Sequence, residues 1–216
     1  MAILDLPSVP TPPDRLQRMQ RQRKFRLTAL CVLALIPLLF TASYWKIMGS
    51  SGYPAIRWVG AAMIVVSILG RTWSSLYIAG RKKRQLITVG PYSLTRNPLY
   101  IFTLLGAFGI GAQSGSLIVG SLFAFVTLLV FAGVVEKEEA FLRREFPVEF
   151  AAYAERVPRF CPRLPGWRDV EELVVKPRLI WRTFGEASLF LLSIPAADAL
   201  ETLQWRLGVP ILVLLP

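Results

Sequence analysis

Two long apolar windows without a charged residue constrain the fold of this chain more than any other feature. Residues Leu27–Tyr44 and Leu117–Val135 each approach the roughly 20 apolar residues that a helix needs to cross a bilayer. Because a segment in lipid must satisfy its own backbone hydrogen bonds, these windows predict helices. Hydrophobic residues make up 54% of the chain and charged residues 18%, a balance typical of an integral membrane protein.

Three further apolar stretches predict additional membrane helices. Trp58–Gly70 and Leu99–Ala112 are shorter, but neighbouring small or aromatic residues extend each to spanning length. The third lies in the tail, at Ala187–Leu200 and Leu207–Pro216, and is interrupted by charged residues and prolines. It predicts either one tilted span or an interfacial helix. We therefore expect an all-α, polytopic membrane helical bundle of about five transmembrane helices with a cytoplasmic helix-loop segment.

Basic residues set the expected orientation. Of the 25 Lys and Arg residues, 14 lie at or before Arg96, against only Asp5 and Asp14. One basic stretch precedes the first span and the run 81–84 follows the second, the pattern that keeps flanks in the cytoplasm. The N-terminus and the loop 80–97 are thus expected on the cytoplasmic side of a bacterial-type inner membrane. These flanking spans favour an anionic membrane surface over nucleic acid as the partner of the basic residues.

The composition divides the chain into three expected parts. Residues 1–26 predict a mobile, proline-containing tail and a basic interfacial helix. Residues 27–165 predict the membrane core, whose last part becomes sharply more polar from Glu136 onward. Residues 166–216 predict a C-terminal extension with one membrane or interfacial helix. The sequence leaves open whether this extension crosses the bilayer, supports a homodimer or gates the site.

Two kinds of chemistry are excluded by residue type. The chain contains no histidine, which rules out histidine-based catalysis and most zinc sites. Cys31 lies inside an expected span and Cys161 in a cytoplasmic loop, so neither a disulfide nor a metal site is expected.

A turn, a cation and aromatic rings gather before the third expected span. Gly90–Tyr92 has the composition of a turn. Asn97 and Pro98 match the preferences for an N-cap and a first helical residue, which is a sufficient structural explanation for both. Arg96, beside that helix start, predicts a bidentate carboxylate or phosphate site, with a snorkelling anchor as the alternative. Tyr100 lies three residues after Asn97, so it lies on the same helix face as the helix start. It is either a site residue or an aromatic residue of the membrane interface.

An acidic pair follows the fourth expected span. Glu138 and Glu139 could be a solvated face paired with Arg143 and Arg144 one turn on. Alternatively, the pair faces the basic loop, where its carboxylates would bind an ammonium group or accept a proton. Arg71, late in the second span, is costly in lipid and should face the bundle or a wet cavity; its role stays open.

The motifs, in this order, resemble those of the isoprenylcysteine carboxyl methyltransferase and phospholipid N-methyltransferase superfamily of integral membrane enzymes. The resemblance covers roughly residues 55–165. The matching residues are Gly90, Pro91, Tyr92, Arg96, Pro98, Tyr100, Glu138, Glu139, Leu142, Phe146, Tyr153 and the run Val157–Pro162. Two residues depart from the family pattern. Asn97 stands where the family usually has histidine, although eukaryotic phospholipid N-methyltransferases resemble this chain in having Asn-Pro there. Pro147 replaces the usual glycine after Phe146.

The resemblance implies S-adenosylmethionine as methyl donor, entering from the cytoplasm, and a lipid-like acceptor that arrives sideways from the bilayer. It implies catalytic roles for Arg96, Glu138 and Glu139. The implied cofactor-binding residues are Gly90, Tyr92, Arg96, Asn97, Pro98, Tyr100, Glu138 and Glu139. The residue chemistry agrees, because a guanidinium suits the donor's carboxylate and an acidic pair suits its ammonium, while tyrosine rings attract a sulfonium.

Two other functions fit part of the sequence. NADPH-dependent sterol or steroid reductases resemble this chain around the Arg-x-Pro-x-Tyr turn, but they generally lack the adjacent acidic pair. A non-catalytic membrane scaffold or transporter subunit would scatter polar residues through several spans, whereas here they gather at one edge. The acceptor stays open among a prenylated thiol carboxylate, phosphatidylethanolamine and a quinone or other isoprenoid.

Overall fold

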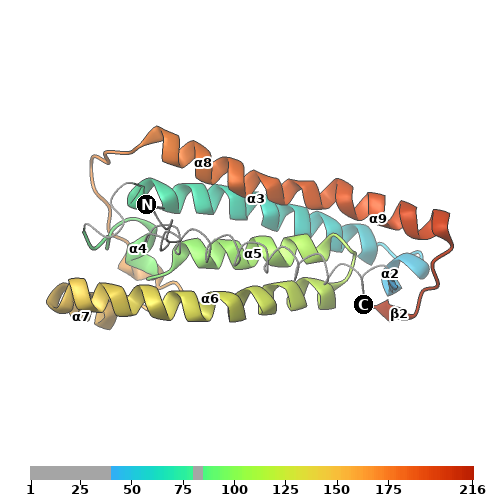
Figure 1. The fold of residues 1–216 in the computed structure, drawn as a ribbon, viewed down its shortest axis with the longest axis horizontal. Coiled ribbons are helices and arrows are strands. Elements are labelled where there is room, and N and C mark those ends of the chain that lie inside the picture. The colour runs from blue at the N-terminus through green and yellow to red at the C-terminus, as the bar shows by residue number, and fades with distance from the viewer. Residues whose placement is uncertain (1–39, 80–84) are drawn as a thin grey trace, which may run out of the picture.

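In a computed structural model, the structure describes residues 40–79 and 85–216. These residues form an elongated bundle whose long helices run side by side along its length (Figure 1). The long helices are α3 (Gly52–Ile78), α5 (Pro98–Ala112), α6 (Leu117–Glu145), α8 (Pro177–Ser188) and α9 (Ser193–Leu207), and the short segment η2 (Leu189–Leu192) joins α8 to α9. The predicted tail and interfacial helix, most of the predicted span Leu27–Tyr44 and the basic run 81–84 lie outside the described residues.

Small residues allow α3 and α5 to pack closely in the centre of the bundle. A Cβ added at Gly109 would lie 2.5 Å from the carbonyl oxygen of Gly60, and one added at Gly106 would lie 2.4 Å from Ser67 Oγ. Ile64 is fully buried beside this contact. Such close approach of two backbones through glycine is characteristic of membrane helix pairs.

Two of the described helices, α3 and α6, are long and apolar enough to cross a membrane, and α5 is a shorter apolar helix. The prediction Leu117–Val135 falls within α6, which then continues through the acidic pair. The prediction that Trp58–Gly70 extends to spanning length is confirmed, because α3 covers it and continues past the charged residues Arg57 and Arg71 at its two ends. One of these, Arg71, faces the bundle as expected, donating to Thr103 Oγ1 at 2.8 Å.

The tail forms one long helical rod along α3 (Figure 1), which contains the predicted stretch Ala187–Leu200, whereas the residues after Leu207 are not helical. Its middle is the 3₁₀ segment η2, which directly precedes the start of α9. Pro195 lies in the first turn of α9, where it cannot donate to Leu191 and its ring would crowd that carbonyl in a regular α-helix. The tighter 3₁₀ geometry upstream relieves this conflict.

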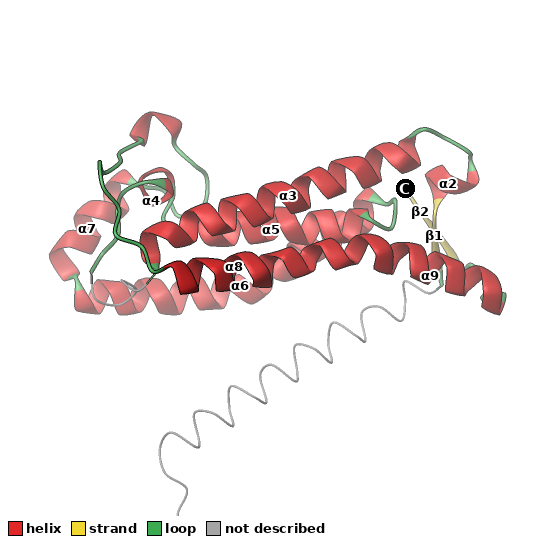
Figure 2. Ribbon diagram, turned by 90° about the horizontal axis from the view of Figure 1, so that it is seen from above, coloured by secondary structure: helices red, strands yellow, loops and turns green. Residues whose placement is uncertain are grey.

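The all-α prediction needs a correction at the end of the bundle away from α7. There β1 (Thr41–Ser43) pairs in parallel with β2 (Val213–Leu215), and Figure 2 shows the two strands crossing beside the short helix α2 (Tyr44–Ile47). Residues 41–43 of the predicted span Leu27–Tyr44 are therefore extended rather than helical, and its last residue, Tyr44, begins α2. Their backbone groups find partners in the C-terminal segment, a pairing that helical periodicity cannot indicate.

The opposite end of the bundle carries the short elements that shape the site. These are α4 (Pro91–Leu94), α7 (Pro147–Arg156) and the 3₁₀ turn η1 (Leu164–Gly166). Phe150 and Tyr153 of α7 form a buried cluster with Val157, against which Leu142 of α6 packs. This cluster fixes α7 and the segment after it against the end of α6.

Candidate active site

The turn at Gly90 adopts a backbone conformation that requires glycine. Its φ is +60°, a region that side chains rarely adopt, and an added Cβ would lie 2.2 Å from the ring of Tyr77. The Gly90 amide donates to the carbonyl of Arg168 at 2.7 Å. Gly90 therefore shapes the start of α4, which places Tyr92 in the interior.

Two buried tyrosines connect α4 to α7. The Tyr153 hydroxyl donates to the Tyr92 carbonyl at 2.7 Å. Burial raises the pKa of Tyr92 and that of Tyr153 above the ordinary tyrosine value, so both phenols stay protonated at neutral pH. Tyr153 is thereby a permanent hydrogen-bond donor that holds α4 in place.

Arg96 lies between α4 and α5 with its guanidinium turned inward. Its backbone amide donates to the Pro158 carbonyl at 2.9 Å, and its side chain is only 15% exposed. Nη1 lies 3.6 Å from Glu139 Oε2, while the buried Nε has no hydrogen-bond partner among the described residues. A buried donor without a partner is costly, so this guanidinium has an unused capacity to bind an acceptor group.

Asn97 precedes α5, and Pro98 is the first helical residue, as predicted. Asn97 thus occupies the N-cap position, but its side chain makes no capping hydrogen bond, so capping does not explain its side chain. Its Nδ2 instead donates to the Arg159 carbonyl at 3.1 Å and to Glu139 Oε1 at 3.4 Å. The amide thus connects the start of α5 to α6 and to the segment after α7.

Glu139 is the centre of the polar cluster. It is 4% exposed and accepts from Arg159 through Nη2 at 2.7 Å and through Nε at 3.2 Å. The hydrogen bond to Glu139 raises the pKa of Arg159 above its already high value. Glu139 therefore pairs across the fold with two guanidinium groups, in contrast to the alternative of a solvated face paired with Arg143.

Glu138 occupies the neighbouring position on α6. Its Oε2 accepts from the Tyr100 hydroxyl at 3.0 Å, and the Tyr100 ring lies 4.7 Å from that of Phe131. Tyr100 is thus oriented by contacts with α6 at both its ring and its hydroxyl.

These side chains surround a cavity of about 720 Å³, within the range of small-molecule sites. Of the eight predicted cofactor-binding residues, six line it: Tyr92, Arg96, Asn97, Tyr100, Glu138 and Glu139. Gly90 and Pro98 lie outside its wall and shape the backbone nearby. The rest of the wall is mainly apolar and includes Leu99, Val130 and Val134. The cavity therefore combines a polar cluster with an apolar surface.

Arg159 was absent from the predicted site residues, although it makes the shortest contact with Glu139 in the cluster. The sequence feature that could have indicated Arg159 is the run Val157–Pro162, because this arginine is part of the motif that the family shares. Only the fold shows that this segment returns to the start of α5, where Thr95 Oγ1 donates to the Arg159 carbonyl at 3.1 Å.

The arrangement fits a zwitterionic amino acid group. Arg96 offers a buried, unpartnered N–H for a carboxylate, and Glu138, in the same cavity wall, offers a carboxylate for an ammonium. Nothing in residues 40–79 and 85–216 brings together three or more His, Cys, Asp or Glu side chains in a group that could hold a metal ion.

Comparisons with known proteins agree with this site. The sequence model of the family described as phospholipid methyltransferase matches residues 55–149. The cobalt-zinc-cadmium resistance protein CzcN of Cupriavidus metallidurans is 40% identical over 73% of this chain and 71% of the relative. The nickel-cobalt-cadmium resistance protein NccN of Alcaligenes xylosoxydans xylosoxydans is 36% identical over 74% and 78% of the two chains.

A more distant relative carries an enzymatic name. Protein-S-isoprenylcysteine O-methyltransferase of Schizosaccharomyces pombe is 29% identical over 44% of this chain and 41% of the relative. No solved structure matches the chain significantly. The apolar helices and the family together define a membrane protein. The chain belongs to the isoprenylcysteine and phospholipid methyltransferase superfamily.

Proposed function

We propose that this protein transfers a methyl group from S-adenosylmethionine to a hydrophobic acceptor that resides in the membrane. The observation that carries the proposal is the Arg96 guanidinium, which lines the cavity beside Glu139 and keeps a buried N–H without a partner among the described residues. Family membership supports methyl transfer as the reaction class.

Each residue of the polar cluster has a distinct role in this proposal. Arg96 binds the carboxylate of the donor's amino acid end, and Glu138 binds its ammonium. Glu139 holds the two guanidinium groups of Arg96 and Arg159 in position. Asn97, which contacts Glu139 through its amide, is a positioning residue. Tyr92 and Tyr100 supply aromatic surface to the same cavity.

S-adenosylmethionine, when bound, supplies a methyl group that is already electrophilic, so no covalent nucleophile is required from the protein. The contribution of this chain is to align donor and acceptor and to exclude water. An amine acceptor would lose a proton, and the proposed acceptor of that proton is the Glu138 carboxylate, which lines the cavity. A carboxylate acceptor would need no base.

The proposed location is an inner membrane with the site at its cytoplasmic face. The basic residues before and after the first expected hairpin support this orientation. The donor would enter from the cytoplasm and the acceptor from the bilayer.

The names of CzcN and NccN refer to resistance to cobalt, zinc, cadmium and nickel. For this chain we propose that any such role depends on its methylated product. A host strain carrying the Arg96→Met variant should then be as metal-sensitive as one lacking the protein.

The direct test is to incubate purified protein with isotopically methyl-labelled S-adenosylmethionine and membrane lipid extracts, and to identify labelled products by mass spectrometry. We expect one apolar labelled product that requires Arg96. The matched control is Arg163→Met, because Arg163 is an exposed arginine near the site that does not line the cavity. No labelled lipid with wild-type protein, or equal labelling by the Arg96→Met variant, would contradict the proposal.

A second measurement separates methyl transfer from the reductase alternative. Thermal unfolding is followed with S-adenosylhomocysteine or with NADPH, since a ligand that binds the folded state raises its apparent stability. We expect stabilisation by S-adenosylhomocysteine alone; stabilisation by NADPH alone would favour the reductase.

A further inference from the structure

The C-terminal rod, formed by α8, η2 and α9 (residues 177–207), is apolar on its outer side as well as on the side that packs. Ala187 is fully buried in a core cluster with residues of α3. Leu189 and Leu192, by contrast, are 62% and 60% exposed, and no residue from 187 to 197 carries a charge. A helix that is apolar all round is typical of a buried or a membrane-spanning segment. The exposed leucines show that, within the part of the chain that the structure describes, this rod is not buried.

The acidic residues of the C-terminal rod all have basic partners. Asp198 contacts α3 although its side chain is 57% exposed. An exposed ion pair contributes little in water, but a carboxylate without a partner is costly in lipid. This complete pairing therefore suits a rod that is surrounded by hydrocarbon. The three salt bridges join Glu186 to Arg182 of α8, Asp198 to Arg57 of α3 and Glu201 to Lys46 of α2.

The six tryptophans of the chain lie in two groups, one toward each end of the bundle. Trp181, near the start of α8, is 71% exposed, and Trp205, in the last turn of α9, is 85% exposed. The helical path between these two residues is roughly 36 Å, which exceeds the hydrocarbon core of about 30 Å and stays within the full bilayer of about 40–45 Å. Tryptophan is enriched at both membrane–water interfaces. Trp73, Trp167 and Trp181 form the group toward the site, and Trp45, Trp58 and Trp205 form the group toward β1 and β2.

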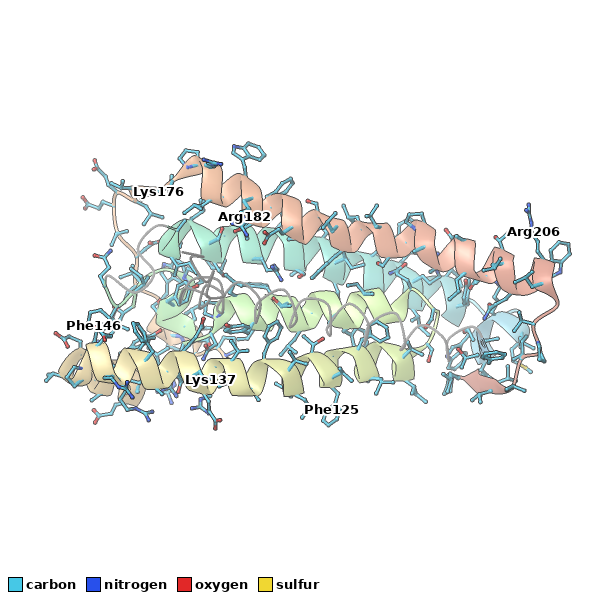
Figure 3. All side chains as sticks on the ribbon, in the orientation of Figure 1. Phe125, Lys137, Phe146, Lys176, Arg182 and Arg206 are labelled. Carbon is cyan, nitrogen blue, oxygen red and sulfur yellow. The ribbon has the colours of Figure 1, made fainter. Side chains whose placement is uncertain are left out.

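We propose that the C-terminal rod crosses the membrane beside α3, with bilayer lipid as the partner of its outer side. The rod and α3 run side by side in both views (Figures 1 and 2), and α3 is long and apolar enough to cross a membrane. Figure 3 shows Lys176, just before the rod, and Arg206, in its last turn, at opposite ends of the bundle. The C-terminus then lies across the membrane from the candidate active site.

The alternative is a helix that lies in the plane of one membrane surface, with both of its ends on the same side. The rod lies outside residues 55–149, which the family model matches, so family membership does not decide between these arrangements. The inference does not depend on methyl transfer, because it uses only the packing, the charges and the tryptophans of the bundle.

The test labels single cysteines in the full chain with a membrane-impermeant maleimide, in intact and in permeabilised spheroplasts. The reporters are Val174→Cys before the rod and Leu212→Cys after it, which replace side chains that are 78% and 70% exposed. Both are made in a chain that carries Cys31→Ser and Cys161→Ser. We expect Leu212→Cys to react in intact spheroplasts and Val174→Cys only after permeabilisation.

The native thiol of Cys161, which is exposed, supplies the control for the side of the membrane on which the site lies. A chain with Cys31→Ser alone should react as Val174→Cys does. Reaction of the two reporters from opposite sides supports the proposal, and reaction of both from one side overturns it.

A second measurement reports directly on the lipid contact of the rod. Spin labels are attached to Leu189→Cys and Leu192→Cys in vesicles, and their collision rates with oxygen and with a polar nickel complex are compared. Leu164→Cys is the control, because Leu164 is 74% exposed outside the rod. The ratio of oxygen to nickel collisions should be at least about threefold higher in the rod than at the control, since apolar oxygen is enriched in hydrocarbon. Equal ratios at all three positions would overturn the proposal.

A charge exchange tests the pairing of the rod with α3. Asp198→Arg places two arginines together and should lower the labelling of Leu212→Cys in intact spheroplasts at least about threefold. Adding Arg57→Asp restores a pair of opposite charges and should restore the labelling. Glu155→Arg makes the same reversal at an exposed residue of α7 and should have no effect. An unchanged Asp198→Arg variant, or a loss that the exchange does not reverse, would refute this role of the pair.

Discussion

Replacing Glu139 with glutamine removes the one negative charge that two guanidinium groups share. The side chain keeps its shape, but Arg96 at 3.6 Å and Arg159 at 2.7 Å then face a neutral amide. Breaking a fully buried ion pair costs about 3–5 kcal/mol, whereas an exposed pair contributes about 0–1 kcal/mol. Arg159 is 41% exposed, so water screens part of the loss, and we expect about 2–3 kcal/mol between these limits.

The assay is thermal unfolding of the purified protein in vesicles. For a chain of this size, the expected loss lowers Tm by roughly 4–12 °C. Glu145→Gln is the control, because Glu145 lies exposed at the end of the same helix. In a double-mutant cycle with Arg159→Met, the two losses should not add, since both remove the same contact. A Tm of Glu139→Gln equal to that of Glu145→Gln, or strictly additive losses, would refute this reasoning.

Three further changes have defined outcomes. Gly90→Ala should lower the stability by about 1–3 kcal/mol, because its φ is +60° and its new Cβ would overlap the Tyr77 ring; unfolding curves measure this. Tyr153→Phe should cost about 1 kcal/mol through the lost bond to the Tyr92 carbonyl. Because burial raises the folded-state pKa of Tyr153, its contribution is complete below the ordinary value of about 10 and is lost progressively as the pH rises from there toward the folded-state pKa. Unfolding between pH 8 and about 11.5 should therefore show a smaller alkaline loss in the variant. Glu201→Gln should lower Tm, since Glu201 accepts hydrogen bonds from Lys46 and Tyr53 at the far end of the bundle. It should leave the S-adenosylhomocysteine affinity within about twofold of the wild type. A larger change in affinity would mean that the two ends of the bundle are coupled.

Local patterns were sufficient to predict the helices that carry the site. The charge-free run Leu117–Val135 lies within α6, and Pro98 begins α5 as its sequence preference indicates. The shared cavity of Arg96 and the acidic pair followed from the resemblance, whose motif brings those residues together in order. The helix α3 includes Arg57 and Arg71, whose partners lie on other helices and could not be predicted from any local pattern.

Contacts between distant segments could not be predicted. The strand pairing of Thr41 with Val213 joins the two ends of the described chain, and nothing in either short segment specifies a partner. The same limit applies to Arg159, whose contact with Glu139 depends on the turn of α7 against α6. Asn97 illustrates a different difficulty, because its sequence context satisfied an N-cap rule while its side chain makes tertiary contacts instead.

The central claim is that Arg96 binds the carboxylate of the methyl donor within the polar cluster. Calorimetric titration of S-adenosylhomocysteine into the wild type, Arg96→Met and the exposed control Arg163→Met tests it most directly. The account predicts a loss of roughly 30-fold or more in affinity for Arg96→Met, the value of a charged hydrogen bond of about 2–3 kcal/mol, and no change for Arg163→Met. Equal affinities in all three proteins would contradict it.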